Sequence, residues 1–355
     1  MLKSSQFNTF RTALSIAIAL ILSFLVIFLV SDQPVEAIMR MITGPLSSKR
    51  LFANVIELMI PLIFTGVSVS IMFSANQINL GAEGSFHLGG LVAAVVGLMV
   101  PMSQGVHPIA AILLGGLTGA VFAAIPAILK IFTTASELVS SLMLNYIALF
   151  LGNYILSYYL RDTTAGALTS HLLPESVKLQ SIVSGTNIHI GLFIALLTAV
   201  FGYLFLFKSK LGYMLRISGE NEKFAKYSGM NIVTVILISQ LLGGFIAGVG
   251  GSVQLLGMYR RFSWAALLGY GWDAIIVTTL SKKNPLFVPL ATFFLAYIRI
   301  GADIMSRSTD VSPEIVAITQ GIIIILIVAE QFLSGYKHKL VAREARLQME
   351  TEGAE

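Results

Sequence analysis

The chain has 355 residues, of which 56% are hydrophobic and only 12% are charged, and its mean hydropathy is +0.84. A soluble domain usually has about 25% charged residues, so this composition indicates a polytopic membrane protein. The net charge of +5 comes from dispersed basic residues beside membrane-length segments, which argues against nucleic-acid binding. The lack of cysteine excludes disulfides and thiolate metal sites.

Ten apolar segments follow one another along the sequence, and a helix needs about 20 residues to cross a bilayer. The first segment is too long for the apolar core of a cleaved signal peptide, so we expect a retained helix. Two segments are short for a full span, and each follows glycine-rich polar residues. These predict broken helices near residues 76–87 and 267–273. The ten segments are Thr12–Val30, Asn54–Phe73, Leu88–Val100, Ile109–Leu129, Leu138–Leu160, Ile188–Phe207, Ile232–Leu256, Ala265–Leu280, Leu286–Ile300 and Pro313–Phe332.

The two predicted breaks suggest an internal repeat. Each is followed by a short apolar segment, a proline-led span and a long final span, and the second copy begins five segments after the first. An odd offset predicts two inverted five-helix halves, a common transporter design, and chance similarity of glycine-rich sequence is the alternative. We therefore predict an all-α polytopic protein of about ten transmembrane helices, in a single domain over residues 1–355.

The basic residues predict how the chain is oriented in the membrane. With the N-terminus inside, most lysines and arginines fall on the cytoplasmic side, and Arg260 and Arg261 are the clearest exceptions. Both termini are then cytoplasmic, together with the loop over residues 208–231 and the tail over residues 334–355. The long outer loop Arg161–Asn187 is either a solvated connector, which we prefer, or a docking surface for an external receptor.

The stretch RISGENEKFAKYSGMNI, from Arg216 to Ile232, is polar in an otherwise apolar chain. Asn221 suits the N-cap of a helix and Gly229 suits its C-terminal cap, so we predict a helix of about two turns between them. A helix this short is not stable alone in water and must pack on something. The membrane interface, the protein's own helix ends and a cytoplasmic partner protein are all compatible with the pattern.

Several catalytic motifs do not occur in the sequence. It has no G-x-x-x-x-G-K-S/T loop for ATP, no H-E-x-x-H zinc motif and no G-x-S-x-G nucleophile turn. The run GGFIAGVGG from Gly243 has no lysine and lies in an apolar segment, so it favours close helix packing over phosphate binding. We therefore predict a transport protein that is not an enzyme, with no cofactor and no metal site.

Four stretches make the sequence resemble a known family. In order and spacing they are similar to permeases of ABC importers in the ribose/branched-chain amino acid superfamily, most closely the nucleoside branch paired with basic-membrane-lipoprotein receptors. The resemblance covers most of the chain, from about Pro61 to Phe332. The stretches are NQINLGAEGSFHLGG (Asn76–Gly90), TASELVSSLMLNYIALFLGNYI (Thr134–Ile155), LGYMLRISGENEKFAKYSGMNI (Leu211–Ile232) and GYGWDAIIVTTLSKKNPL (Gly269–Leu286).

The resemblance implies one permease subunit of an ATP-driven importer in the cytoplasmic membrane of a prokaryote. Its partners would be an ABC ATPase subunit, a second permease subunit that is identical or not, an external substrate-binding lipoprotein and membrane lipid. The cargo would be a nucleoside. Ribose or another simple sugar is the alternative cargo, because Ser85, Ser218, Lys226 and Ser281 depart from the family's pattern. An ion-coupled secondary transporter is a further alternative, with a carboxylate of the breaks as its coupling group.

The resemblance also implies that residues 208–231 form a coupling loop whose short helix docks on the ATPase. Phe224 shares one face of that helix with Asn221, Ala225 and Ser228, which are spaced at helical intervals. The residues expected to couple to the ATPase are Arg216, Gly219, Asn221, Phe224, Ala225, Tyr227, Ser228 and Gly229.

Polar residues in the breaks and in one apolar span are candidates for lining a substrate pathway. Glu83 and Asp273 are also explained as caps of the helices that follow them. Trp272 either stacks on a base or sugar face or packs in the core. Polar residues inside a span usually face the bundle interior, where an interhelical hydrogen bond is the alternative to a pathway role. The candidates are Asn76, Asn79, Glu83, Asn145, Tyr146, Trp272 and Asp273.

Overall fold

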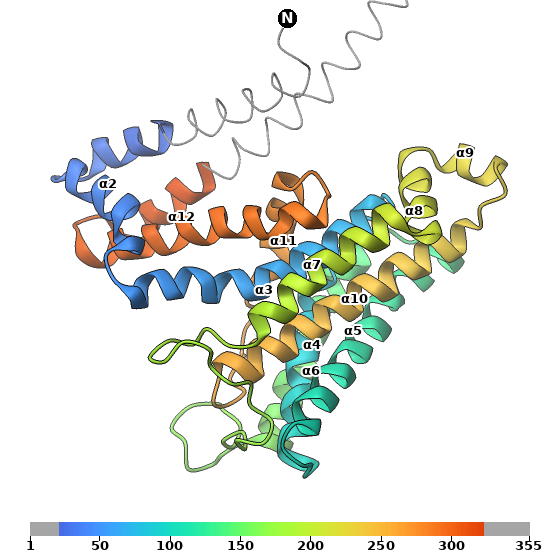
Figure 1. Cartoon of the computed structure of the whole chain (residues 1–355), viewed down its shortest axis with the longest axis horizontal. Coiled ribbons are helices and arrows are strands. Elements are labelled where there is room, and N and C mark those ends of the chain that lie inside the picture. Colours follow the sequence, from blue (N-terminus) through green and yellow to red (C-terminus); the bar gives the residue numbers. More distant parts are fainter. Residues whose placement is uncertain (1–20, 323–355) are drawn as a thin grey trace, which may run out of the picture. The chain divides into compact units, whose positions relative to one another are not determined.

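A computed structural model describes residues 21–322 of the chain (Figure 1). Within this range the backbone is helical without any β-strand, and two isolated bridges join Arg161 to Ser170 and Ser181 to His189. Seven of the helices in these residues are long and apolar enough to cross a membrane. The protein is therefore all-α and multi-pass, as its composition predicts.

The described helices begin at Ile21 and connect through short loops, apart from two long non-helical segments. A π-helical turn follows the helix that ends at Ile155, and short 3-10 turns precede the helices that begin at Lys49 and Val288. The elements are the helix Ile21–Val30, α2 (Pro34–Thr43), η1 (Gly44–Leu46), α3 (Lys49–Ser74), α4 (Ala82–Met99), α5 (Val106–Thr133), α6 (Glu137–Ile155), η2 (Leu156–Leu160), α7 (Gly191–Lys208), α8 (Lys210–Glu220), α9 (Glu222–Tyr227), α10 (Ile232–Met258), α11 (Tyr270–Leu280), η3 (Pro285–Phe287), α12 (Val288–Ser308) and a helix over 313–322.

The chain forms two compact units, of which the first contains the described residues 21–48 and 297–322. Sequence reasoning missed its helix α2, which begins with Pro34, a residue suited to a first helical turn. Ala37 and Met41 are its buried residues. The backbone of α2 approaches Gly301 so closely that a Cβ there would collide with the Met41 carbonyl oxygen. This close approach explains why a glycine stands in the middle of α12.

The second unit, Lys49–Ala296, is built around α10, which packs against α3, α4 and α5 (Figure 1). Glycines bring these backbones together: a Cβ on Gly244 or Gly248 would collide with carbonyl groups of α5, and one on Gly89 would collide with α10. The prediction that the glycine-rich run from Gly243 serves close packing is confirmed. This packing fixes the start of α4 against the centre of the unit.

The first break is shorter than predicted, and the second lies closer to the N-terminus than predicted. The helix expected to begin at Leu88 begins at Ala82, so the first break covers only residues 75–81. The helix expected to begin at Ala265 begins at Tyr270, and the second break covers residues 259–269. The glycines after Gly81 looked like helix breakers, but they lie within α4 at points where neighbouring atoms approach too closely for a Cβ.

The predicted count of about ten spans is met only in part. The helix α11 has 11 residues, too few for a full span. The first and last predicted segments, Thr12–Val30 and Pro313–Phe332, extend outside the described residues, as does the tail over 334–355. The inverted five-helix halves stay a prediction.

Candidate functional site

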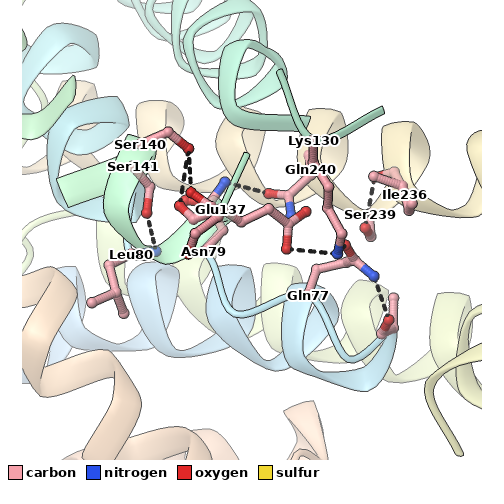
Figure 2. Close-up of polar contacts among 12 residues, drawn as sticks. Gln77, Asn79, Leu80, Lys130, Glu137, Ser140, Ser141, Ile236, Ser239 and Gln240 are labelled. Atoms are coloured by element: carbon pink, nitrogen blue, oxygen red, sulfur yellow. Dashed lines mark hydrogen bonds and ion pairs between the residues drawn. The ribbon is translucent and has the colours of Figure 1, made fainter. Parts of the chain in front are cut away.

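The first break is fastened by side chains from neighbouring helices (Figure 2). Lys130, near the end of α5, donates to Gln77 Oε1 at 2.6 Å and pairs with Glu137 of α6 at 3.1 Å. The Glu137 side chain is only 5% exposed, whereas that of Lys130 is 34% exposed, so solvent screens one end of the ion pair. The pair ties the connection between α5 and α6 to the break.

Asn79 joins the same break to α10 (Figure 2). Its Nδ2 donates to Gln240 Oε1 at 2.6 Å, and its Oδ1 accepts the N–H of Gly81 at 2.5 Å. The N–H of Leu80, the residue between Asn79 and Gly81, donates to Ser141 Oγ at 3.0 Å. Asn79 is fully buried, and its amide oxygen satisfies a backbone N–H that the break would otherwise leave unpaired.

Asn145 of α6 bridges the end of the first break and the first turn of α4. Its Nδ2 donates to the Leu80 carbonyl at 3.0 Å, and its Oδ1 accepts the N–H of Gly84 at 2.9 Å. Both polar ends of this amide are therefore used in interhelical hydrogen bonds. Its neighbour Tyr146 is 57% exposed, so the structure does not bring the two candidates together at one point.

Glu83, in the first turn of α4, connects the two breaks. Its carboxylate accepts the N–H of Gly269 at 2.7 Å and also the N–H of Gly271. The expectation that Glu83 caps its own helix is wrong: it caps α11, because that helix start lies against α4 and needs an anionic acceptor. Asp273 is buried close enough for its charge to act on Glu83.

The remaining candidates differ in their exposure to solvent. Trp272 and Asp273 were expected in the second break but stand in the first turn of α11. Trp272 is 54% exposed, and Asn76 is exposed at the turn of the first break, where its φ is 55°. The buried candidates are Asn79, Glu83, Asn145 and Asp273, and the exposed ones are Asn76, Tyr146 and Trp272.

The second break is held mainly by the long loop over residues 161–190. Ser170 and Phe262 exchange two hydrogen bonds of 2.9 Å, and Arg261 pairs with Asp162 at 2.5 Å. Hydrogen bonds from the Thr164 hydroxyl and from Arg261 hold the pKa of Asp162 well below its ordinary value. Most of this loop is exposed or half-buried, while Ser170 and Leu173 are buried and bond to the second break. The choice between a solvated connector and a docking surface for a receptor stays a prediction.

The predicted polar helix is confirmed as α9. Asn221 Oδ1 accepts the N–H of Phe224 at 3.0 Å, as an N-cap should, and Gly229 has a positive φ of 79°. Ala225 is fully buried and anchors the helix. Phe224 is 56% exposed and Tyr227 is 91% exposed, so α9 presents two aromatic rings outwards. Asn221, Ser228 and Gly229 are exposed beside them.

Besides the buried Ala225, two of the expected coupling residues do not lie on this exposed face. Arg216 of α8 donates through Nε to the Leu206 carbonyl at 3.0 Å, with its guanidinium 4.7 Å from the ring centre of Phe207. Gly219 packs on the end of α3, where a Cβ would collide with the Ser74 carbonyl oxygen. The structure thus shows these residues fastening α8 to α7 and to the helix that leads into the first break.

Sequence reasoning missed several residues of this arrangement. Lys283, after α11, donates to the Phe73 carbonyl at 3.1 Å, and burial lowers the pKa of its ammonium group, while Glu220 nearby raises it. Lys130 and Gln240 were also missed. The opposite charges of Lys130 and Glu137 at the ends of consecutive helices were a signal for the ion pair, but Gln240 had none.

A family model described as the permease component of the branched-chain amino acid transport system matches residues 51–328. The chain belongs to this family. It is 31% identical to the guanosine ABC transporter permease protein NupP of Bacillus subtilis, over 80% of this chain and 83% of that protein.

Two further relatives match almost the whole length. The chain is 28% identical to the glucose ABC transporter permease protein TsgB13 of Haloferax volcanii, over 91% of this chain and 88% of that protein. It is 25% identical to the nucleoside ABC transporter permease protein NupB of Lactococcus lactis, over 90% and 92%.

Proposed function

We propose that this chain is a permease subunit of an ATP-driven ABC importer that carries nucleosides across the cytoplasmic membrane of a prokaryote, with both termini in the cytoplasm. The observation that carries the proposal is α9, a short capped helix with two exposed aromatic rings, which follows α8, the helix that packs against the start of the first break. The family membership and the relatives named as nucleoside permeases support it.

In this proposal α9 is the surface on which the ATPase subunit docks. Phe224 and Tyr227 are large side chains exposed on a polar loop, and aromatic residues carry much of the binding energy at protein interfaces. The chain has no G-x-x-x-x-G-K-S/T loop, so the energy for transport comes from the partner. A second permease subunit and an external substrate-binding lipoprotein complete the assembly.

The contacts give a continuous route from α9 to both breaks. Movement of α9 and α8 reaches the C-terminal end of α3 through Gly219, and the first break follows directly. Asn79 then passes the displacement to α10, and Glu83 passes it to the start of α11. Chains of packed elements and hydrogen bonds of this kind carry energetic coupling between distant sites.

The docking role is tested by replacing both exposed rings with alanine, Phe224→Ala together with Tyr227→Ala. We expect the affinity for the purified ATPase subunit to fall at least about tenfold, because exposed aromatic anchors dominate such interfaces. Tyr159→Ala, in η2 and 62% exposed, is the matched control and should bind normally. Unchanged affinity of the double variant would refute docking on α9.

A second cargo is favoured by one observation, the 28% identity to the glucose permease of Haloferax volcanii. Uptake of tritiated guanosine and of labelled glucose by proteoliposomes containing the full complex separates the two. The nucleoside assignment predicts saturable, ATP-dependent guanosine uptake that excess glucose does not inhibit. Glucose uptake without nucleoside uptake would replace it. Transport by the isolated permease with an ion gradient and no ATP would instead support a secondary transporter.

A further inference from the structure

Three buried histidines in the second unit differ in the hydrogen bonds of their ring nitrogens. His107 bonds through both ring nitrogens, to Ser176 Oγ at 2.9 Å and to the Val96 carbonyl at 3.2 Å. His189 accepts a backbone N–H through Nδ1 at 3.1 Å. His87, which is 2% exposed, makes no hydrogen bond through either nitrogen. An unsatisfied polar side chain in the core of a native protein calls for an explanation, because desolvating it is unfavourable.

Aromatic rings surround His87. Its ring centre lies 5.9 Å from that of Phe262 and 6.0 Å from that of Trp264. Trp264 stacks on Phe86 at 5.7 Å. On the α6 side there is no room for a side chain, since a Cβ on Gly152 would collide with the His87 ring. The histidine therefore brings a polar ring edge into a mainly aromatic cluster, which also contains the indole N–H of Trp264.

The position of His87 links this cluster to the junction of the two breaks. His87 stands four residues after Glu83 in α4, so both side chains lie on one face of the helix. Phe262 and Trp264 belong to the second break, which is irregular backbone held by the loop over residues 161–190. A displacement of the second break would expose His87 and the faces of these rings without unfolding a helix.

We propose that His87 is a specificity-determining residue, whose ring nitrogens bind the polar edge of the cargo's planar ring while Phe262 and Trp264 contact its faces. The inference rests on the nucleoside function proposed above. Neutral imidazole offers one donor and one acceptor, which complements the mixed donor and acceptor edge of a nucleobase. Binding sites of this kind are mostly aromatic and apolar, with a few polar groups that fix orientation. The rings fill the space in this structure, and the site opens when the second break moves.

The test is His87→Leu in the full importer complex, with two measurements. Thermal unfolding in detergent should show an unchanged or higher midpoint, because the variant removes an unsatisfied polar group. ATP-dependent uptake of tritiated guanosine should show a KM about tenfold higher, the loss expected for a hydrogen-bonding contact. The ratio of guanosine to uridine uptake should change, since the two bases present different edges.

Two further variants keep the result interpretable. His87→Gln retains a donor and an acceptor and should recover part of the lost affinity even if His87→Leu accumulates poorly. His107→Leu removes a histidine with two bonded nitrogens, and should lower the unfolding midpoint while leaving the KM of the remaining protein unchanged. A stable His87→Leu protein with normal KM and normal base preference would overturn the proposal.

Uptake by the wild-type complex distinguishes a failure of this inference from a failure of the proposed nucleoside function on which it rests. If the wild type carries no nucleoside, the proposed cargo fails irrespective of His87. If it carries guanosine and the His87 variants are unaltered, only the role of His87 fails. Glucose uptake with a KM that His87→Leu raises would keep a cargo contact but overturn its assignment to a nucleobase.

Discussion

The first and second breaks are held by different kinds of contact. Residues 75–81 are tied by side-chain contacts with α5, α6 and α10, including the bond of Asn79 to Gln240 and the contacts of Lys130 with Gln77 and Glu137. Residues 259–269 are tied mainly by hydrogen bonds to the long loop over 161–190. The first break begins beside α8, whereas the second follows the opposite end of α10 from α9. We therefore expect the first break, which is tied by side chains, to transmit force, and the second break, which is tied by a loop, to open.

Glu83 joins the two breaks, and its removal should have the largest effect. We expect Glu83→Ala to lower the free energy of unfolding by about 4 kcal/mol, because two buried N–H groups at the start of α11 lose their charged acceptor. Glu83→Gln keeps one acceptor oxygen and should lie between the wild type and Glu83→Ala. Denaturant unfolding in detergent measures both, and equal stability of the wild type and Glu83→Ala would show that the breaks are not joined here.

The contact between α8 and the first break is tested by Gly219→Leu. The new side chain has to displace the end of α3, at a cost of about 3 kcal/mol for overpacking. We expect the ATPase subunit to bind normally, since α9 is intact, but uptake to fall at least about tenfold. Gly166→Ala, which meets no atom within 4 Å, is the control and should transport normally. Normal uptake by Gly219→Leu would mean that force reaches the breaks by another route.

The loop that holds the second break should weaken at acidic pH. Burial lowers the pKa of His189 to about 4, so between pH 6.5 and 4 the unfolded chain takes up a proton that the folded chain does not. Stability is therefore lost as pH falls, by about 2 kcal/mol at pH 5 compared with pH 7.5. His189→Asn should flatten the profile of unfolding midpoint against pH. Parallel profiles for the two proteins would exclude His189 as the cause.

The ion pair at the first break should give the smallest effect. A double-mutant cycle with Lys130→Met and Glu137→Gln should yield a coupling energy of about 1 kcal/mol, because Glu137 is buried but Lys130 is partly exposed to solvent. The exposed pair of Lys178 with Glu175, where the glutamate side chain is 84% exposed, is the matched control and should give less than about 0.5 kcal/mol. Equal coupling energies for the two pairs would show that burial of Glu137 does not strengthen the ion pair at the first break.

Local sequence signals predicted the elements whose stability is local. The caps of α9 were recognised because Asn221 and Gly229 act within one or two turns of their own helix. The short helix α11 and a break before α4 were also foreseen. The boundary at Ala82 was not foreseen, because glycines that seem to interrupt a helix in isolation are used for close packing in the bundle. The boundary at Tyr270 was not foreseen either, because Gly269 has a positive φ of 83° and the helix begins only after it.

The amino-acid sequence by itself determined the class of this protein: a helical membrane chain, with a capped polar helix in one loop and no G-x-x-x-x-G-K-S/T loop for ATP. Only the tertiary structure decided what the polar residues do. Glu83 was expected to cap its own helix, but its partners stand 186 and 188 residues away. Helix propensity, caps and hydropathy are properties of neighbouring residues, whereas the acceptor for a buried N–H is chosen by which helices pack together.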